Sequence, residues 1–200
     1  MAVSDQILSA AQAAGINPPQ LALEVAIQES GLNQNARGAA GEIGIFQLLP
    51  STAAMLGVDP TDPAQNIQGG CRYLAMLLTQ FGDPVAAVAA YNAGPGTVQN
   101  AIGSYGRDAS SGYPAWFHGI PSSTQSYVSS IFNNLNTQYA INFNLGILEP
   151  AASGSAPSTG VTAAGVPTTA PSPWILAIAI GGLALLWLFS NPQLYSIQRR

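Results

Sequence analysis

Apolar residues recur every three or four positions through the first two thirds of the chain, which is the spacing of helices that bury one face. Ile7, Leu8 and Ala11 form the first such group, and Gly15 is expected to end that helix. The pattern and its Gly and Pro punctuation predict further helices over residues 19–30, 52–56, 63–81, 84–93 and 127–139. No alternating run is long enough to predict a sheet, so residues 1–145 are expected to form one mainly helical domain.

The composition changes after residue 145. Residues 146–173 are rich in Ala, Ser, Thr, Gly and Pro, a composition that buries too little apolar surface to order itself, so a disordered linker is expected there. Residues 174–190 are apolar apart from Gly and a final Ser, which predicts one C-terminal transmembrane helix, followed by a short tail over residues 191–200 that ends in two Arg. A buried core helix or a partner-binding helix is the alternative interpretation of this apolar segment.

The ionisable residues exclude several classes of function. Nine acidic side chains stand against five basic ones, and the net charge of -4 argues against nucleic-acid binding. Cys71 and His118 are the single residues of their types, so a disulfide within the chain is impossible, and a His-based metal site or a Ser/His/Asp triad would have only one histidine to draw on. We therefore expect Cys71 to be buried and no metal or cofactor to be required.

One carboxyl group lies on an apolar helix face. Leu21, Ala22, Val25 and Ala26 come before Glu29 at helical spacing, so all five are expected on the same side of the helix. Apolar surroundings disfavour an ionised carboxylate, which predicts a raised pKa for Glu29, as a general acid near neutral pH requires. A solvated or Arg-paired glutamate at a helix end is the alternative, and periodicity alone does not decide between them.

Several segments together resemble soluble lytic transglycosylases, which belong to the goose-lysozyme-like superfamily. Glu29 with Ser30 is followed by GIFQLLPSTA at 44–53, NIQGGCRYLAMLL at 66–78 and AAYNAGPGTV at 89–98, in the order found in that family. IPSSTQSYVSSI at 120–131 is similar to the family's closing segment. The resemblance covers about residues 17–135. It implies a lysozyme-like helical fold and cleavage of the β-1,4 bond between N-acetylmuramic acid and N-acetylglucosamine in peptidoglycan, with a 1,6-anhydromuramyl product.

The resemblance also implies which residues act. The glutamate matching Glu29 protonates the glycosidic oxygen, and its carboxylate then takes the proton of the C6 hydroxyl, so that one carboxylate suffices. Gly44 and Gln47 are implied to shape the cleft floor, and the segment 91–93 its opposite wall. The residues implied to bind substrate are Ser30, Gly44, Phe46, Gln47, Tyr91, Asn92, Ala93 and Tyr127. For the two tyrosines, ordinary core packing is the alternative.

Some positions depart from the family's pattern. Gly38 stands where the family usually has Ser, Leu49 where it has Met, and Ser123 where it has Glu. A goose-type lysozyme, which is a hydrolase, tends to place aspartates in the cleft at the positions of Gly38 and Leu49, neither of which can activate water. Glu42 is an acid where Ala is common. We expect it on the surface, although its presence keeps hydrolysis as an alternative.

A different class of function is a membrane-anchored structural or wall-binding protein that kept the fold and lost the activity. The joint presence of Glu29, Gln47, Tyr91 and Asn92 argues against it. The expected partners are peptidoglycan glycan strands, a lipid membrane through residues 174–190, and virion or envelope proteins. Because the N-terminus carries no secretory signal and the apolar segment is C-terminal, we expect a phage virion membrane as the location, with a bacterial envelope as the alternative.

Overall fold

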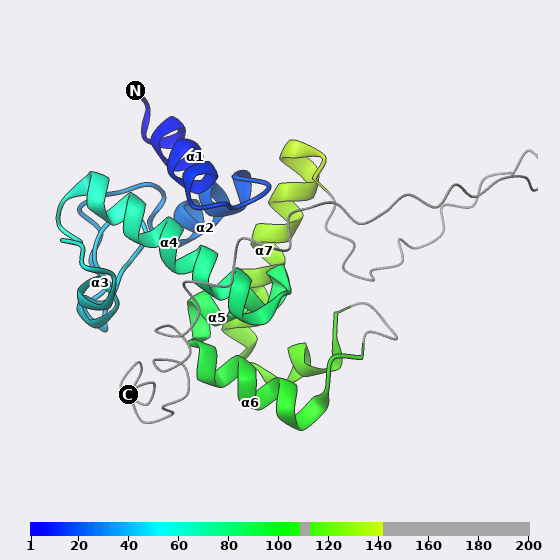
Figure 1. Ribbon diagram of the computed structural model, residues 1–200. Helices are drawn as coiled ribbons and strands as arrows, with labels where there is room; N and C mark the ends of the chain where they lie inside the picture. Colours follow the sequence, from blue (N-terminus) through cyan, green and yellow to red (C-terminus); the bar gives the residue numbers. More distant parts are fainter. Residues whose placement is uncertain (109–112, 142–200) are drawn as a thin grey trace, which may run out of the picture. The chain divides into compact units, whose positions relative to one another are not determined.

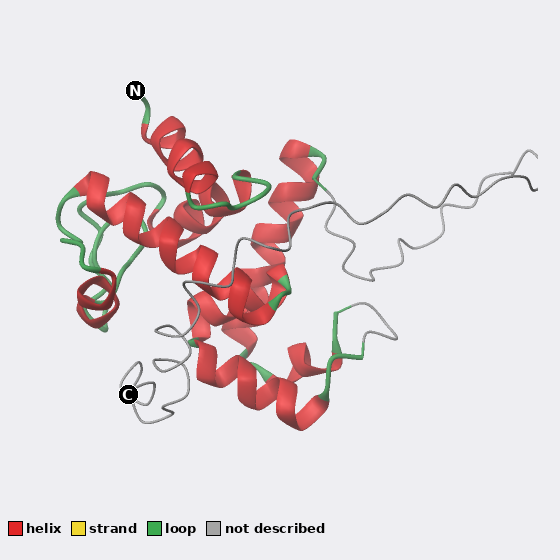
Figure 2. Ribbon diagram, viewed as in Figure 1, coloured by secondary structure: helices red, strands yellow, loops and turns green. Residues whose placement is uncertain are grey.

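The structure is a computed structural model that describes residues 1–108 and 113–141, which form helices joined by loops (Figure 1). The elements are α1 (Val3–Ala13), α2 (Gln20–Ser30), α3 (Pro50–Leu56), α4 (Pro63–Phe81), α5 (Pro84–Ala93), α6 (Pro95–Tyr105), the 3-10 helix η1 (Ala115–Gly119) and α7 (Ser122–Tyr139). Within these ranges the only β-type pairing consists of isolated bridges that join Ile43 to Arg37 and to Leu48 (Figure 2). The expected mainly helical domain is confirmed for this part of the chain.

Proline and aspartate define where α4 and α5 begin. The carboxylate of Asp62 accepts a hydrogen bond from the backbone N–H of Gln65 at 2.8 Å, and that of Asp83 accepts one from Val85 at 2.9 Å. Each aspartate is followed by a proline, which fits the first position of a helix because its missing N–H would have no helical partner there. Gly82 ends α4 in the left-handed region at φ 63°. The predicted bounds of both helices are confirmed.

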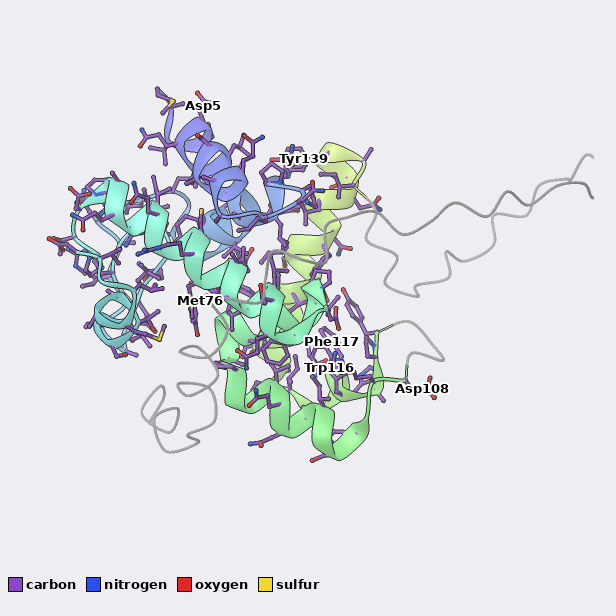
Figure 3. All side chains as sticks on the ribbon, in the orientation of Figure 1. Asp5, Met76, Asp108, Trp116, Phe117 and Tyr139 are labelled. Carbon is purple, nitrogen blue, oxygen red and sulfur yellow. The ribbon has the colours of Figure 1, made fainter. Side chains whose placement is uncertain are left out.

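Helix α5 packs against α4, α6 and α7 and contributes a continuous part of the core. Residues 85–91 are all buried, and four of these seven are alanines, whose small side chains let the neighbouring helices approach closely. From η1, Trp116 and Phe117 enter the same core and contact each other edge to face, with ring centroids 5.9 Å apart (Figure 3). Helix α5 is therefore packed against neighbouring helices on several sides.

A buried carboxyl group joins α2 to α7. Glu24 is 1% exposed and accepts hydrogen bonds from Asn134 Nδ2 at 2.9 Å and from Tyr139 Oη at 3.2 Å. Burial, and then the charge of Glu24, raise the pKa of the Tyr139 hydroxyl. Because Glu29 lies on α2 and Tyr127 on α7, this contact helps to set the positions of both residues. The apolar pattern of the sequence does not predict it.

Cys71 lies inside the core on α4. Its side chain has no exposed surface, and its Sγ is 3.9 Å from the carbonyl oxygen of Ile7 on α1. Burial raises the pKa of the thiol to about 12. The expectation that this cysteine is buried is confirmed.

The remaining helix predictions differ from the structure at their edges. Helix α3 begins two residues earlier than predicted, at Pro50, and α7 begins five residues earlier, at Ser122, directly after Pro121. The first turn of α7 carries mainly Ser and Thr and so lacks a strong apolar pattern. The sequence pattern does not predict α6 and η1. Gly94 and Pro95 indicate the end of α5, and Pro95 also begins α6.

The expected linker over 146–173, the transmembrane helix over 174–190 and the tail over 191–200 lie outside the described residues. Among the helices that the structure does describe, none combines the length and the apolar character needed to cross a membrane.

Candidate active site

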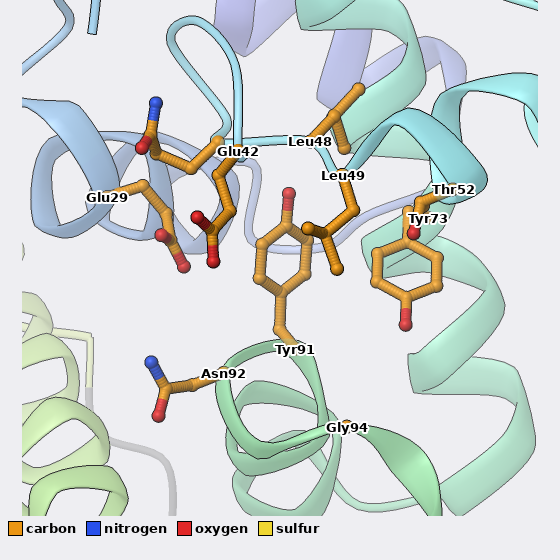
Figure 4. Close-up of a pocket in the computed structure, with 10 residues that line it drawn as sticks. Glu29, Glu42, Leu48, Leu49, Thr52, Tyr73, Tyr91, Asn92 and Gly94 are labelled. Atoms are coloured by element: carbon orange, nitrogen blue, oxygen red, sulfur yellow. The ribbon is translucent and has the colours of Figure 1, made fainter. Parts of the chain in front are cut away.

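A cleft lies between the end of α2, the loop over residues 31–49, and the helices α4 and α5 (Figure 4). Its walls combine two carboxyl groups with amide, aromatic and aliphatic side chains. The residues that line it are Glu29, Glu42, Gln47, Leu48, Leu49, Thr52, Tyr73, Tyr91, Asn92 and Gly94. Acid, amide and aromatic groups facing one space can protonate a bound molecule, hydrogen-bond to it and stack on it.

Glu29 is half-buried in the last turn of α2, and the hydroxyl of Tyr127 donates a hydrogen bond to its Oε1 at 2.8 Å. The four apolar residues that predicted its helix face are all buried. The neighbouring Ser30 donates from Oγ to the carbonyl oxygen of Ile45 at 2.7 Å, which ties the end of α2 to the cleft loop. Glu29 is thus oriented from α7 and from the loop, and its raised pKa stays a prediction.

The cleft loop is held in shape by Asn66 of α4, which is fully buried. Its Nδ2 donates to the carbonyl oxygens of Ile43 at 2.8 Å and Pro60 at 3.0 Å, and its Oδ1 accepts from the N–H of Phe46 at 2.9 Å. Gly44 has φ 79°, and a Cβ at that position would lie 2.5 Å from Asn66 Nδ2. Backbone conformation and close approach therefore both require glycine here.

Gln47 follows in the same loop and lines the cleft. It adopts φ 45°, and its Nε2 donates to the carbonyl oxygen of Gly44 at 2.8 Å. A left-handed backbone at a non-glycine residue is uncommon and is held here by the surrounding contacts. The amide is therefore fixed in the cleft wall.

Tyr91 and Asn92 form the side of the cleft that α5 provides. The Tyr91 hydroxyl donates to the carbonyl oxygen of Phe46 at 2.9 Å, and its ring lies 5.3 Å from that of Tyr73 on α4. Burial, followed by the negative charge of Glu29, raises the pKa of Tyr91 well above its ordinary value. Asn92 accepts from Thr124 Oγ1 at 2.8 Å through Oδ1, and Figure 4 shows its amide nitrogen on the side of the cleft that holds Glu29.

The expectation that Glu42 lies on the outer surface is wrong. Glu42 is half-buried and lines the cleft, and Figure 4 shows its carboxyl group pointing into the same space as that of Glu29. The reason is the fold of the loop, in which the N–H of Gly38 donates to the carbonyl oxygen of Glu42 at 2.9 Å and so turns this side chain inward. The cleft thus contains two carboxyl groups.

Several residues implied by the resemblance lie behind the cleft wall. Phe46 is fully buried, and its ring packs where a Cβ at Gly70 would otherwise sit, so its side chain does not line the cleft and its role in substrate binding stays a prediction. Gly44 is also buried, while Ser30 and Ala93 are half-buried at the ends of α2 and α5 without lining the cleft. These residues support the ones that face the space.

Other lining residues were not predicted. Tyr73 lies seven residues after Asn66 on α4, which places the two on one helix face, and this spacing is a signal that the sequence offered. Leu48, Leu49 and Thr52 come from the loop and from α3, whose approach to the cleft is set by tertiary packing. In the ranges 1–108 and 113–141, no three His, Cys, Asp or Glu residues are grouped so that they could hold a metal ion.

Comparison with known proteins places this geometry in a family. Residues 6–113 match the family described as transglycosylase SLT domain. The "Transglycosylase" of Enterobacteria phage PRD1 is 32% identical over 143 residues, which cover 71% of this chain and 45% of the phage protein. The chain thus spans less than half the length of that relative.

Two solved structures are similar in fold. A complex of the 70-kDa soluble lytic transglycosylase with bulgecin A has a TM-score of 0.59 and 27% identity, over 73% of this chain and 25% of that one. An inactive mutant of the lytic transglycosylase Slt from Pseudomonas aeruginosa has a TM-score of 0.55 and 25% identity, over 69% of this chain and 24% of that one. Since the family match covers more than half of the sequence, this chain belongs to the transglycosylase SLT domain family.

Proposed function

We propose that this chain is a peptidoglycan lytic transglycosylase that uses Glu29 as its acid. The observation that carries the proposal is the carboxyl group of Glu29, half-buried in a cleft and held by the Tyr127 hydroxyl at 2.8 Å. The relative from phage PRD1 is named a transglycosylase, which supports the same activity here. The inactive form of the Pseudomonas aeruginosa relative carries one Glu to Gln substitution, which supports an essential glutamate in proteins of this fold.

In the proposed reaction, protonated Glu29 donates its proton to the oxygen that joins N-acetylmuramic acid to N-acetylglucosamine, and the bond from that oxygen to C1 breaks. The Glu29 carboxylate then removes the proton of the muramic acid C6 hydroxyl, whose oxygen forms a bond to C1. The product carries a 1,6-anhydro ring, and Glu29 is protonated again. Because the attacking hydroxyl belongs to the same sugar, proximity replaces an activated water.

The other lining residues are assigned to binding. The amides of Gln47 and Asn92 can hydrogen-bond to sugar hydroxyl and acetamido groups, and both are fixed by the contacts at 2.8 Å described above. Tyr73 and Tyr91 present aromatic surface to the cleft, where a sugar ring can pack. Tyr127 acts through Glu29, which it orients.

A goose-type hydrolase is the second candidate, and the position of Glu42 favours it specifically. Most glycosidases use two carboxyl groups. One, as the acid, protonates the leaving oxygen, and the other, as the carboxylate, activates water or attacks the sugar. A non-catalytic wall-binding protein explains neither carboxyl group in the cleft. The products separate the first two candidates, since a transglycosylase forms anhydromuramyl ends and a hydrolase alone forms only reducing ends.

For the location we propose a membrane-anchored enzyme with domain 1–145, linker 146–173, membrane helix 174–190 and tail 191–200. The linker composition and the apolar run support this arrangement, and the relative from a phage supports a virion enzyme that opens the wall locally during entry. Deleting residues 174–200 should release the protein from vesicles of phosphatidylethanolamine and phosphatidylglycerol in a density gradient. Continued flotation of the shortened chain would show that the anchor lies elsewhere.

The activity is tested with the full chain in detergent on purified peptidoglycan. The wild-type protein should release anhydromuropeptides, while Glu29→Gln should release none above the background without enzyme, because an amide cannot donate the proton. Far-UV circular dichroism of both proteins shows whether the variant is folded. Absence of product from a folded wild-type chain would contradict the proposal.

A further inference from the structure

Glu42 is held in the cleft by its own loop. The backbone N–H of Ala40 donates a hydrogen bond to Glu42 Oε2 at 2.9 Å, and the N–H of Gly38 donates to the Glu42 carbonyl oxygen at 2.9 Å. The N–H of Gly41 donates to the carbonyl oxygen of Gly38 at 3.2 Å, which closes a further turn. Backbone and side chain of Glu42 are therefore both fixed, so that the carboxyl group faces the cleft in a defined orientation.

The missing side chain at Gly38 makes room for this carboxyl group. A Cβ at Gly38 would collide with Oε2 of Glu42, and it would lie 2.8 Å from the Glu42 carboxyl carbon and 2.9 Å from its Cβ. Since real Cβ atoms do not approach so closely, a side chain at position 38 and the present position of Glu42 exclude each other. The carboxyl group of Glu42 therefore occupies space at the cleft that a side chain at position 38 would otherwise fill.

We propose that Glu42 is a second catalytic carboxylate, which lets this cleft hydrolyse a share of the bonds that it cleaves. The inference rests on the proposed function, because it needs Glu29 as the acid. Glu29 gives its proton to the glycosidic oxygen and the C1–O bond breaks. Glu42 takes one proton from a water molecule, whose oxygen forms the new bond to C1. One water is consumed, and solvent returns a proton to Glu29 and removes one from Glu42.

The two routes then compete for the same sugar. Attack by the C6 hydroxyl has the advantage of an intramolecular reaction, with an effective molarity of roughly 10⁵–10⁸ M against about 55 M for water. A positioned general base accelerates attack by water ~10²–10⁴-fold. Because the Glu29 carboxylate gives the C6 hydroxyl the same kind of assistance, anhydro ends remain the major product, and hydrolysis assisted by Glu42 adds reducing ends as a minor product. Both carboxyl groups are only half-buried, so water reaches them.

The test measures the two kinds of product end in one digest. Full-length wild-type protein is incubated with purified peptidoglycan, the products are reduced with borodeuteride, and mass spectrometry counts labelled reducing ends against unlabelled anhydro ends. Glu42→Gln keeps the size of the side chain and removes the base. Gly38→Ala keeps Glu42 and displaces its carboxyl group. Asp5→Asn removes one negative charge on the exposed face of α1, outside the cleft, and serves as the control.

We expect wild-type protein and Asp5→Asn to give both kinds of end in the same ratio. In Glu42→Gln the ratio of reducing to anhydro ends should fall at least about tenfold, as removal of a general base requires, and Gly38→Ala should lower it in the same direction. A wild-type digest with anhydro ends alone, or an unchanged ratio in folded Glu42→Gln, overturns the inference. If the wild-type digest contains no product of either kind, the proposed function itself fails.

Discussion

Replacing Asn66 with alanine should loosen the loop that forms the cleft. The variant removes two donors from the carbonyl oxygens of Ile43 and Pro60 and one acceptor from the buried N–H of Phe46. At about 1 kcal/mol for each hydrogen bond, the free energy of unfolding should fall by about 3 kcal/mol. Such a loss is a large part of the stability of a small domain, which is roughly 5–15 kcal/mol.

The measurement is urea unfolding of the full chain, followed by far-UV circular dichroism. Gln68→Ala is the matched control, because Gln68 lies on the same helix and is exposed, and its stability should change by less than about 0.5 kcal/mol. At low urea, where Asn66→Ala is still folded, its cleavage rate should fall as well, since Phe46 and Gln47 depend on the same loop. A loss of stability no larger than that of Gln68→Ala would refute the assignment of Asn66 as the support of the loop.

Three further experiments test other parts of the structure. Tyr127→Phe removes a hydrogen-bond donor to the Glu29 carboxylate, so the pKa of Glu29 should rise and the alkaline limb of the pH–rate profile should move to higher pH. An unmoved limb would count against the hydrogen bond between Tyr127 and Glu29. Cys71, with its thiol pKa raised to about 12, should resist iodoacetamide in the folded protein at pH 8 and react in urea. Because the thiol of the unfolded chain ionises near its ordinary pKa of 9.0, the free energy of unfolding should also fall as pH rises from 9.0 to about 12. Glu24→Ala removes the hydrogen-bond acceptor of Asn134 and Tyr139 and should lower the free energy of unfolding by about 2 kcal/mol in the same urea assay. A loss below about 0.5 kcal/mol would show that this contact does not hold α2 to α7.

Local punctuation determined which helices were predictable. Asp62 with its proline, Gly82 and Asp83 mark helix ends through contacts within a few residues, so the bounds of α4 and α5 followed from the sequence. Helix α6 was missed because Gly94 and Pro95 serve two helices at once, and the Ser-rich start of α7 carries too few apolar residues to show a period. The two misses therefore have different causes: a boundary shared by two helices for α6, and a weak apolar pattern for the start of α7.

The residues of the candidate site also fall into those that sequence motifs predict and those that only the packing of the fold determines. Motif resemblance implied that Glu29, Gln47, Tyr91 and Asn92 share a cleft, and the structure brings them together. The inward turn of Glu42 depends on backbone contacts of its loop and on the empty space at Gly38, neither of which leaves a periodic signal in the sequence. Phe46 resembled a substrate contact because it lies inside a motif, yet its ring faces Gly70 in the core. A motif therefore identified the site's location, whereas packing decided which side chains face it.

The most direct test of the central claim is the Glu29→Gln variant of the full chain, digested with purified peptidoglycan beside the wild-type protein and Asp5→Asn. The assignment of Glu29 as the acid predicts that anhydromuropeptide release falls to the background without enzyme in Glu29→Gln, while its circular dichroism spectrum matches that of the wild type. Asp5→Asn should cleave at the wild-type rate. Release of anhydromuropeptides by folded Glu29→Gln at a rate near that of the wild type would contradict the role of Glu29.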